Sequence, residues 1–345
     1  MGKIGEAELK AQIKSGEYSN VYLIYGEERY LKEYYVNKLK SKLVDPAFQD
    51  FNLHCFEGKS ASLDEILMDA QTLPMMSEYS LVIANDYPLD KSASDIDKLK
   101  EYFKDIPETS IVVFYMDSIE VDTKKSAKWR TLTDLFSKCG SSVNLEKRSE
   151  GELVKLIVSS AKKRGCIIEP NRARYLIGVV GSDIQTIFNE LEKLCSYVGE
   201  GEITKSIIDK LAVKSLQARV FDLSRFILKG DSDGAYGVLN TLFSLKEEPI
   251  GILSVITSCY IDMYRVKCAK AANVNENDVA KHYSYKGREF LIRNAARDSA
   301  YINIDTLREA IDLLAKTDEL MKSTSIDKRL LLEETVAKLL LLRNK

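Results

Sequence analysis

The sequence is poor in the residues on which catalytic and metal sites most often depend. It contains 2 histidines in 345 residues, and its 6 cysteines are scattered without a C-x-x-C pair. Histidine is the side chain best suited to acid–base chemistry near neutral pH and the commonest metal ligand. Zinc sites and disulfide frameworks need clustered cysteines. We therefore expect no metal, no cofactor and reduced thiols.

Neither histidine is placed like a catalytic base. His54 lies in an alternating, strand-like segment, and His282 lies in a basic segment. We expect the first to be satisfied or solvent-facing and the second to lie at the surface. The motifs G-x-S-x-G and H-E-x-x-H and paired carboxylates are absent as well. The sequence therefore predicts a protein that works by binding, with no catalytic residues of its own.

A large charge of one sign is also lacking. The chain has 50 Lys and Arg against 52 Asp and Glu, a net charge of −2, whereas a dedicated nucleic-acid-binding protein is usually strongly basic. No apolar run approaches the length of a membrane span, and the first residues lack the apolar core of a signal peptide. With 45% hydrophobic residues, the chain can bury sizeable cores in two or three domains. We expect a soluble, cytoplasmic protein without a membrane partner.

One segment nearly forms a nucleotide-binding loop. The apolar run 21–25 has strand character and leads into Gly26, after which a helical pattern begins. A working phosphate-binding loop needs a second glycine, a Lys for the phosphates and a Ser or Thr for magnesium. Here Glu27 and Glu28 follow the glycine, and the next lysine, Lys32, has no Ser or Thr beside it. The segment predicts an ATPase-type fold whose degenerate loop does not bind ATP.

The first 145 residues alternate between strand-like and helix-like patterns, which predicts a parallel sheet covered on both faces. The expected strands are 21–25, 51–56, 80–85, 111–116 and 142–145. The expected helices are 31–43, 63–72, 96–103 and 125–136. After residue 145 the strand signal stops.

Only helical patterns follow, first short and then longer. The expected short helices are 152–164, 171–180, 184–197 and one beginning at 204. Beyond about residue 214 the helices lengthen, and no proline occurs after Pro249. We predict an α/β domain at 1–145, a small helical domain at 146–213 and a larger helical domain at 214–345.

Five local patterns, taken in order, resemble the delta-subunit family of bacterial DNA polymerase III clamp loaders. They are residues 21–33, residues 70–83, residues 189–194 after Gly181-Ser182-Asp183, residues 221–223, and Asp318 with Lys322. The resemblance implies a RecA-like AAA+ domain, a helical lid and a helical collar. It also implies a non-catalytic component of the DNA polymerase III holoenzyme that binds the sliding clamp and helps open it for loading onto primed DNA. The implied partners are the clamp and the loader subunits of the tau/gamma and delta prime types, with DNA met only within the complex.

The resemblance places the clamp contact in the turn Leu73-Pro74-Met75-Met76. Pro74 should end the preceding helix and stiffen the turn. Methionine side chains are flexible enough to fill an irregular pocket on a partner. The alternative is that Leu73 and one methionine pack beneath the strand that starts near Tyr79.

A basic segment from residue 265 to 297 carries candidate DNA contacts. We single out Lys281, Lys286, Arg288, Arg293 and Arg297. The aromatic residues Tyr283, Tyr285 and Phe290 are interleaved with them, and such a pattern can track a phosphate backbone and stack bases. A solvated helical face is the alternative.

Lys138, in Ser137-Lys138-Cys139, takes the place of the arginine finger of ATPase subunits, and we assign it no role.

Two other functions remain open at this point. The first is an ATP-hydrolysing AAA+ subunit of a clamp loader, which the missing Lys-Ser/Thr pair after Gly26 disfavours. The second is a stand-alone nucleic-acid-binding protein, which the net charge disfavours.

Overall fold

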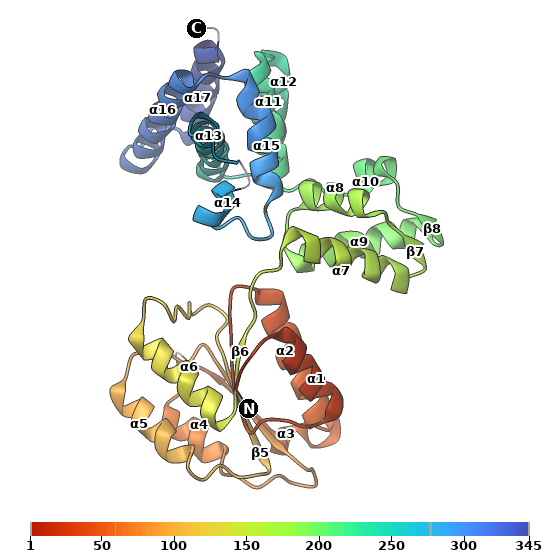
Figure 1. Ribbon diagram of the computed structural model, residues 1–345, viewed down its shortest axis with the longest axis vertical. Helices are drawn as coiled ribbons and strands as arrows, with labels where there is room; N and C mark the ends of the chain where they lie inside the picture. Colours follow the sequence, from red (N-terminus) through yellow and green to blue (C-terminus); the bar gives the residue numbers. More distant parts are fainter. Residues whose placement is uncertain (1, 59, 276–277, 344–345) are drawn as a thin grey trace. The chain divides into compact units, whose positions relative to one another are not determined.

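The computed structural model describes residues 2–58, 60–275 and 278–343, apart from the side chain of residue 281. The chain divides into two compact units, Met1–Lys147 and Arg148–Lys345 (Figure 1). The division lies close to the first boundary predicted from the sequence, and the separation of lid from collar near residue 213 stays a prediction.

The first unit is built on a six-stranded, wholly parallel sheet with the order β1-β6-β2-β5-β4-β3. The strands are β1 (Gly2–Ile4), β2 (Val21–Tyr25), β3 (Leu53–Glu57), β4 (Ser80–Asn85), β5 (Ser110–Tyr115) and β6 (Ser141–Asn144). All five residues of β2 are buried, as expected for a central strand that is covered on both faces.

Helices cover both faces of this sheet (Figure 1). They are α1 (Glu6–Ser15), α2 (Arg29–Leu43), the 3-10 turn η1 (Pro46–Phe48), α3 (Gln49–Asn52), α4 (Leu63–Asp69), α5 (Ala93–Tyr102) and α6 (Ala127–Cys139). On one face α4, α5 and α6 pack their apolar residues against β2, β4 and β5 in one continuous core. On the other face α1 and α2 pack against the sheet (Figure 1).

The predicted alternation of strands and helices is confirmed, with two differences at the ends of elements. The pair β1 and α1 was not predicted, because β1 has only three residues and depends on its pairing with β6. Phe51 was predicted to lie in a strand but belongs to α3, and β3 begins two residues later at Leu53. The apolar–polar alternation of residues 51–56 suggested a strand with its polar residues facing solvent. The polar residue Asn52, at the end of α3, is instead fully buried.

The second unit is almost entirely helical. Its first part holds α7 (Glu150–Lys163), α8 (Pro170–Val180), α9 (Ile184–Val198) and α10 (Lys205–Leu211), with β7 (Cys166–Ile167) paired to β8 (Gly201–Glu202). Its second part holds α11 (Leu216–Lys229), α12 (Ser232–Ser244), α13 (Pro249–Ala271), α14 (Val279–His282), α15 (Phe290–Asp298), η3 (Ser299–Tyr301), α16 (Ile304–Ser323) and α17 (Lys328–Arg343). The two short strands correct the expectation that strands stop after residue 145.

Candidate functional site

The segment from residue 70 to 79 connects α4 to β4 and lies at the edge of the sheet where β4 begins. Three of its apolar side chains are exposed to solvent. Leu73 is 78% exposed, Met76 is 77% exposed and Met75 is 48% exposed. The alternative interpretation, in which Leu73 and a methionine pack beneath the following strand, is therefore wrong. Three large apolar side chains on one turn form a candidate contact surface for a partner.

This turn is fixed by a side chain from a different part of the chain. Asn52 is fully buried, and its Nδ2 donates to the carbonyl oxygen of Met75 at 2.8 Å and to Oγ of Ser77 at 2.9 Å. In return, the Met75 N–H donates to Asn52 Oδ1 at 2.7 Å. The next residue, Met76, has a φ of 51°, which lies in the left-handed region that non-glycine residues rarely adopt.

Two further exposed apolar side chains lie near residues that hydrogen-bond or lead to the turn. Phe51, next to Asn52, is 55% exposed, and Met68, near the end of α4, is 65% exposed. The Thr72 hydroxyl donates to the Met68 carbonyl oxygen at 3.5 Å, which joins the turn to the end of α4. Sequence reasoning missed Phe51 because a strand residue was expected there.

The degenerate nucleotide loop lies at the opposite edge of the sheet, after β2. Gly26 has a φ of 122°, and a Cβ on it would lie 2.3 Å from the carbonyl oxygen of Leu145. The Glu28 N–H donates to that same oxygen at 3.0 Å, and Leu145 N–H donates to the Tyr25 carbonyl oxygen at 2.8 Å. In a working loop, backbone N–H groups bind phosphate oxygens. Here one of the loop's N–H groups, that of Glu28, is bound to the Leu145 carbonyl oxygen instead.

Lys32, the lysine nearest to this loop, is also held by the protein. It is 3% exposed, and its Nζ donates to the carbonyl oxygens of Met116 at 2.6 Å and Asp117 at 3.0 Å, just after β5. Burial lowers the pKa of the Lys32 ammonium, although the carboxylates of Asp117 and Asp86 oppose the effect. The ammonium group is therefore directed at two carbonyl oxygens at the end of a central strand.

The acidic residue after β4 is also bound by other groups of the protein. Asp86 accepts hydrogen bonds from Ser118 N–H at 2.9 and 3.0 Å, from Ser118 Oγ at 2.6 Å and from Ile119 N–H at 3.2 Å. Burial alone would raise the pKa of Asp86, but these hydrogen bonds outweigh it and lower the pKa. An ATPase would need a carboxylate here that is available to magnesium and water.

The basic candidates for DNA contact are less available than the sequence suggested. Arg293 Nη2 donates to both carboxylate oxygens of buried Glu150 at 2.7 and 2.8 Å. Arg297 donates to both oxygens of buried Asp298 at 2.7 and 3.0 Å. Both arginines therefore neutralise buried carboxylates within the second unit.

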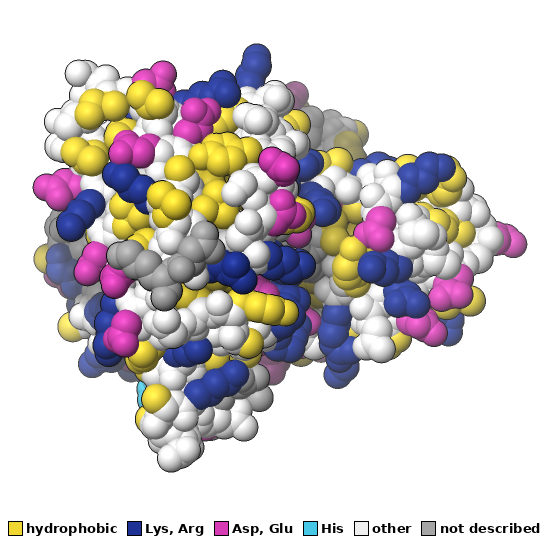
Figure 2. Space-filling model, turned by 90° about the horizontal axis from the view of Figure 1, so that it is seen from above, with side chains coloured by type: hydrophobic (Ala, Val, Ile, Leu, Met, Phe, Trp, Pro, Cys, Tyr) yellow, Lys and Arg dark blue, Asp and Glu magenta, His cyan; other side chains and the backbone are white. Residues whose placement is uncertain are grey.

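The other members of the basic set differ in their surroundings. Lys286 is exposed, and Arg288 is partly buried with Nη2 donating to the Ser284 carbonyl oxygen at 3.0 Å. The side chain of Lys281 lies outside the described residues. Lys and Arg side chains are spread over much of the face in Figure 2, and Asp and Glu side chains lie among them.

The aromatic residues of this segment do not form a stacking surface. Tyr285 is 4% exposed and Phe290 is 7% exposed, so the expectation that they could stack on bases is wrong. Tyr283 is half-exposed, and the Arg265 guanidinium lies 3.8 Å from the centroid of its ring. Tyr285 packs against α13, where its hydroxyl contacts Asp262 and Arg265. The ring of Phe290 packs edge-on against that of Phe221 in α11.

The remaining candidates lie where structural roles were expected. His54 Nδ1 lies 2.9 Å from Asp69 Oδ2, and His282 is exposed. Leu191 and Leu194 are fully buried in α9. Among the described residues there is no group of His, Cys, Asp and Glu side chains that could hold a metal ion, and no described helix has the length and apolarity to cross a membrane.

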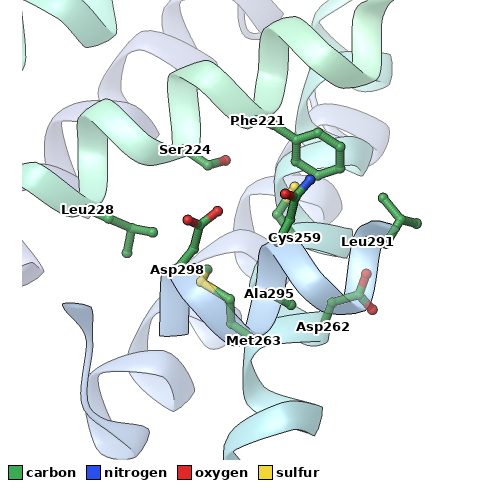
Figure 3. A pocket seen from close by; sticks show the side chains of 10 residues that line it. Phe221, Ser224, Leu228, Cys259, Asp262, Met263, Leu291, Ala295 and Asp298 are labelled. Carbon is green, nitrogen blue, oxygen red and sulfur yellow. The ribbon is translucent and has the colours of Figure 1, made fainter. Parts of the chain in front are cut away.

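A small cavity in the second unit offers no site for a cofactor. It lies among α11, α13 and α15, and the side chains of Ser224, Cys259, Asp262 and Asp298 line it together with apolar residues (Figure 3). Its volume is about 10 Å³, which is room for about one water molecule. Burial strongly raises the pKa of the Cys259 thiol, so this thiol is not reactive at neutral pH.

Comparisons with known proteins agree with the arrangement of both units. A family model described as the DNA polymerase III delta subunit matches residues 22–146, and one described as its C-terminal domain matches residues 217–339. A third model, described as a middle domain, matches residues 149–210. The first two models together match well over half of the chain.

Two curated relatives and one solved structure carry matching names. DNA polymerase III subunit delta of Bacillus subtilis is 28% identical over 336 residues, 95% of each chain. A probable DNA polymerase III subunit delta of Aquifex aeolicus is 23% identical over 256 residues, 72% of this chain and 70% of the relative. The solved structure of the DNA clamp loader delta protein of Bacillus subtilis matches with a TM-score of 0.64 at 25% identity, over 97% of this chain and 99% of that one. The chain belongs to the DNA polymerase III delta subunit family.

Proposed function

We propose that this chain is a non-catalytic clamp-loader subunit that binds the sliding clamp and helps open it for loading onto primed DNA. The observation that carries the proposal is the exposure of Leu73, Met75 and Met76 on a turn that is held in place by hydrogen bonds to a buried asparagine. Apolar side chains that enter a pocket often dominate the energy of an interface. Membership of the delta family supports the clamp as the partner of this turn.

The alternative, an ATP-hydrolysing AAA+ subunit, has little support from the residues around Gly26. The Glu28 N–H and the Lys32 ammonium are both bound to backbone carbonyl oxygens. Glu27 and Glu28 would repel a triphosphate, and no Lys-Ser/Thr pair is present to oppose them.

We therefore predict that the isolated chain neither binds nor hydrolyses ATP. A calorimetric titration with Mg-ATP should give only heats of dilution, because the closed loop offers no group to neutralise the phosphates. A second titration with an ATP-binding loader subunit serves as the positive control. Binding at micromolar affinity would restore the ATPase function and overturn this part of the proposal.

The helical region from 214 to 345 is the proposed contact with the other loader subunits, of the tau/gamma and delta prime types. Its last helix carries exposed apolar residues, Leu330 at 59% and Leu341 at 68%, which a neighbouring collar could cover. We infer that DNA is contacted only within this assembly, with Lys286 as one exposed basic candidate. The cytoplasm, where bacterial DNA is replicated, is the proposed location.

Reconstitution of the loader tests this function. The host's other loader subunits, its sliding clamp and a primed template would be mixed with and without this chain, and clamps retained on the DNA would be counted. We expect loading only when the chain is present. Loading at the same rate in its absence would contradict the proposed role.

A further inference from the structure

The turn that carries Leu73, Met75 and Met76 has little backbone support of its own. Within the described residues, the backbone of residues 73–79 makes no hydrogen bond to other backbone groups. The hydrogen bonds between Asn52 and the residues Met75 and Ser77 fix the backbone path of the turn. A turn with exposed apolar side chains and no such support would sample many conformations, and binding would have to order it.

We propose that Asn52 is a positioning residue for clamp binding, holding the turn in its binding conformation in the free protein. The inference rests on the proposed function of the turn. An amide side chain suits this task because it offers a donor and an acceptor in one plane. Asn52 uses both on one residue: it accepts from the N–H of Met75 and donates to the carbonyl oxygen of Met75. Met76 follows immediately and is held at its positive φ.

The buried position of Asn52 makes this arrangement stiff. Its side chain comes from the last residue of α3, next to β3, which is paired along its whole length with β4. The turn leads directly into β4, and Asn52 adds a second link, from the turn to the start of the neighbouring strand β3. None of the three hydrogen bonds involves an apolar side chain, which leaves Leu73, Met75 and Met76 free to meet a partner.

The chain offers a matched control in Asn20. Its Nδ2 donates to the carbonyl oxygens of Pro107 at 3.2 Å, Glu108 at 3.0 Å and Ser110 at 3.1 Å. It therefore holds another loop, the one that enters β5 at the same edge of the sheet, with the same number of hydrogen bonds. Asn20→Ala should destabilise the sheet unit much as Asn52→Ala does, without touching the turn.

The experiment measures clamp affinity, thermal melting and the hydrogen exchange of the Met75 amide in the full chain. The variants are Asn52→Ala, Asn52→Asp, Asn20→Ala and Leu73→Ala/Met76→Ala. Asn52→Asp keeps an acceptor for the Met75 N–H but loses both donated hydrogen bonds, and it serves if Asn52→Ala does not fold. We expect Asn52→Ala to weaken clamp binding about 10- to 100-fold, since several residues must then be ordered on binding. Asn52→Asp should lie between Asn52→Ala and the parent.

Hydrogen exchange separates positioning from stability. In the free protein, exchange at Met75 should accelerate in Asn52→Ala while the amides of β4 keep their protection, and Asn20→Ala should change neither Met75 exchange nor clamp affinity. If Asn52→Ala and Asn52→Asp bind the clamp like Asn20→Ala, the positioning role is wrong. If Leu73→Ala/Met76→Ala binds like the parent, the proposed function of the turn itself is wrong, which is a separate result.

Discussion

Replacing Leu73 and Met76 with alanine should lower the affinity for the sliding clamp by about two to four decades and leave the melting temperature unchanged. Burying one such side chain in a partner is worth roughly 1.5–3 kcal/mol. Removing two independent anchors therefore costs about 3–6 kcal/mol of binding free energy. The fold should not respond, because both side chains are more than three-quarters exposed in the free protein. Affinity would be measured by titration calorimetry and stability by thermal melting.

A matched control for this prediction is Leu341→Ala. Leu341 is a similarly exposed leucine on α17, in the other unit of the chain. It should leave binary clamp binding at the parent value. Unchanged affinity in the double variant would mean that the clamp is bound elsewhere. Lost affinity together with a lowered melting temperature would mean that the two residues support the fold.

Lys32→Ala should lower the free energy of unfolding by about 2–4 kcal/mol. The substitution leaves the carbonyl oxygens of Met116 and Asp117 without the ammonium that binds them, and each buried polar group left unsatisfied costs about 1–3 kcal/mol. Urea denaturation would measure the loss. Lys42→Ala, at an exposed position of the same helix, is the control and should change stability by less than about 0.5 kcal/mol.

The pH dependence of this effect has a definite sign. Burial lowers the pKa of Lys32 in the folded chain below the ordinary lysine value of the unfolded chain. Between these two values the unfolded chain binds more protons, so this group makes stability rise with pH there. Lys32→Ala should lose that rise, while Lys42→Ala should keep it. An alanine variant as stable as the parent would show that the two carbonyl oxygens do not depend on Lys32.

The sequence was sufficient to locate five of the six strands of the sheet and to predict a degenerate nucleotide loop. In a chain that alternates strand-like and helix-like segments, a short apolar run such as 80–85 is most simply a buried strand. The lack of a Lys-Ser/Thr pair after Gly26 can be read directly from the sequence. The family resemblance located the apolar turn, and its exposure needed the structure. Whether a side chain on the turn is exposed depends on which other parts of the folded chain pack against it.

Contacts between distant residues could not be predicted. Lys32 binds carbonyl oxygens 84 and 85 residues away, and Asn52 binds a turn 23 residues away. No periodicity connects such positions. Tyr285 and Phe290 were misjudged for a related reason. Their spacing among basic residues resembles a nucleic-acid-binding surface, yet both are buried, Tyr285 against Asp262 of α13 and Phe290 against Phe221 of α11.

The most direct test of the account is the affinity of the full chain for the host's sliding clamp, measured in parallel with and without Mg-ATP. We propose that the chain binds the clamp through its exposed apolar turn and that its nucleotide loop, in which the Glu28 N–H is bound to the Leu145 carbonyl oxygen, takes no part. We therefore predict saturable binding with the same dissociation constant in both buffers. Binding that requires ATP, or no binding in either buffer, would contradict the account.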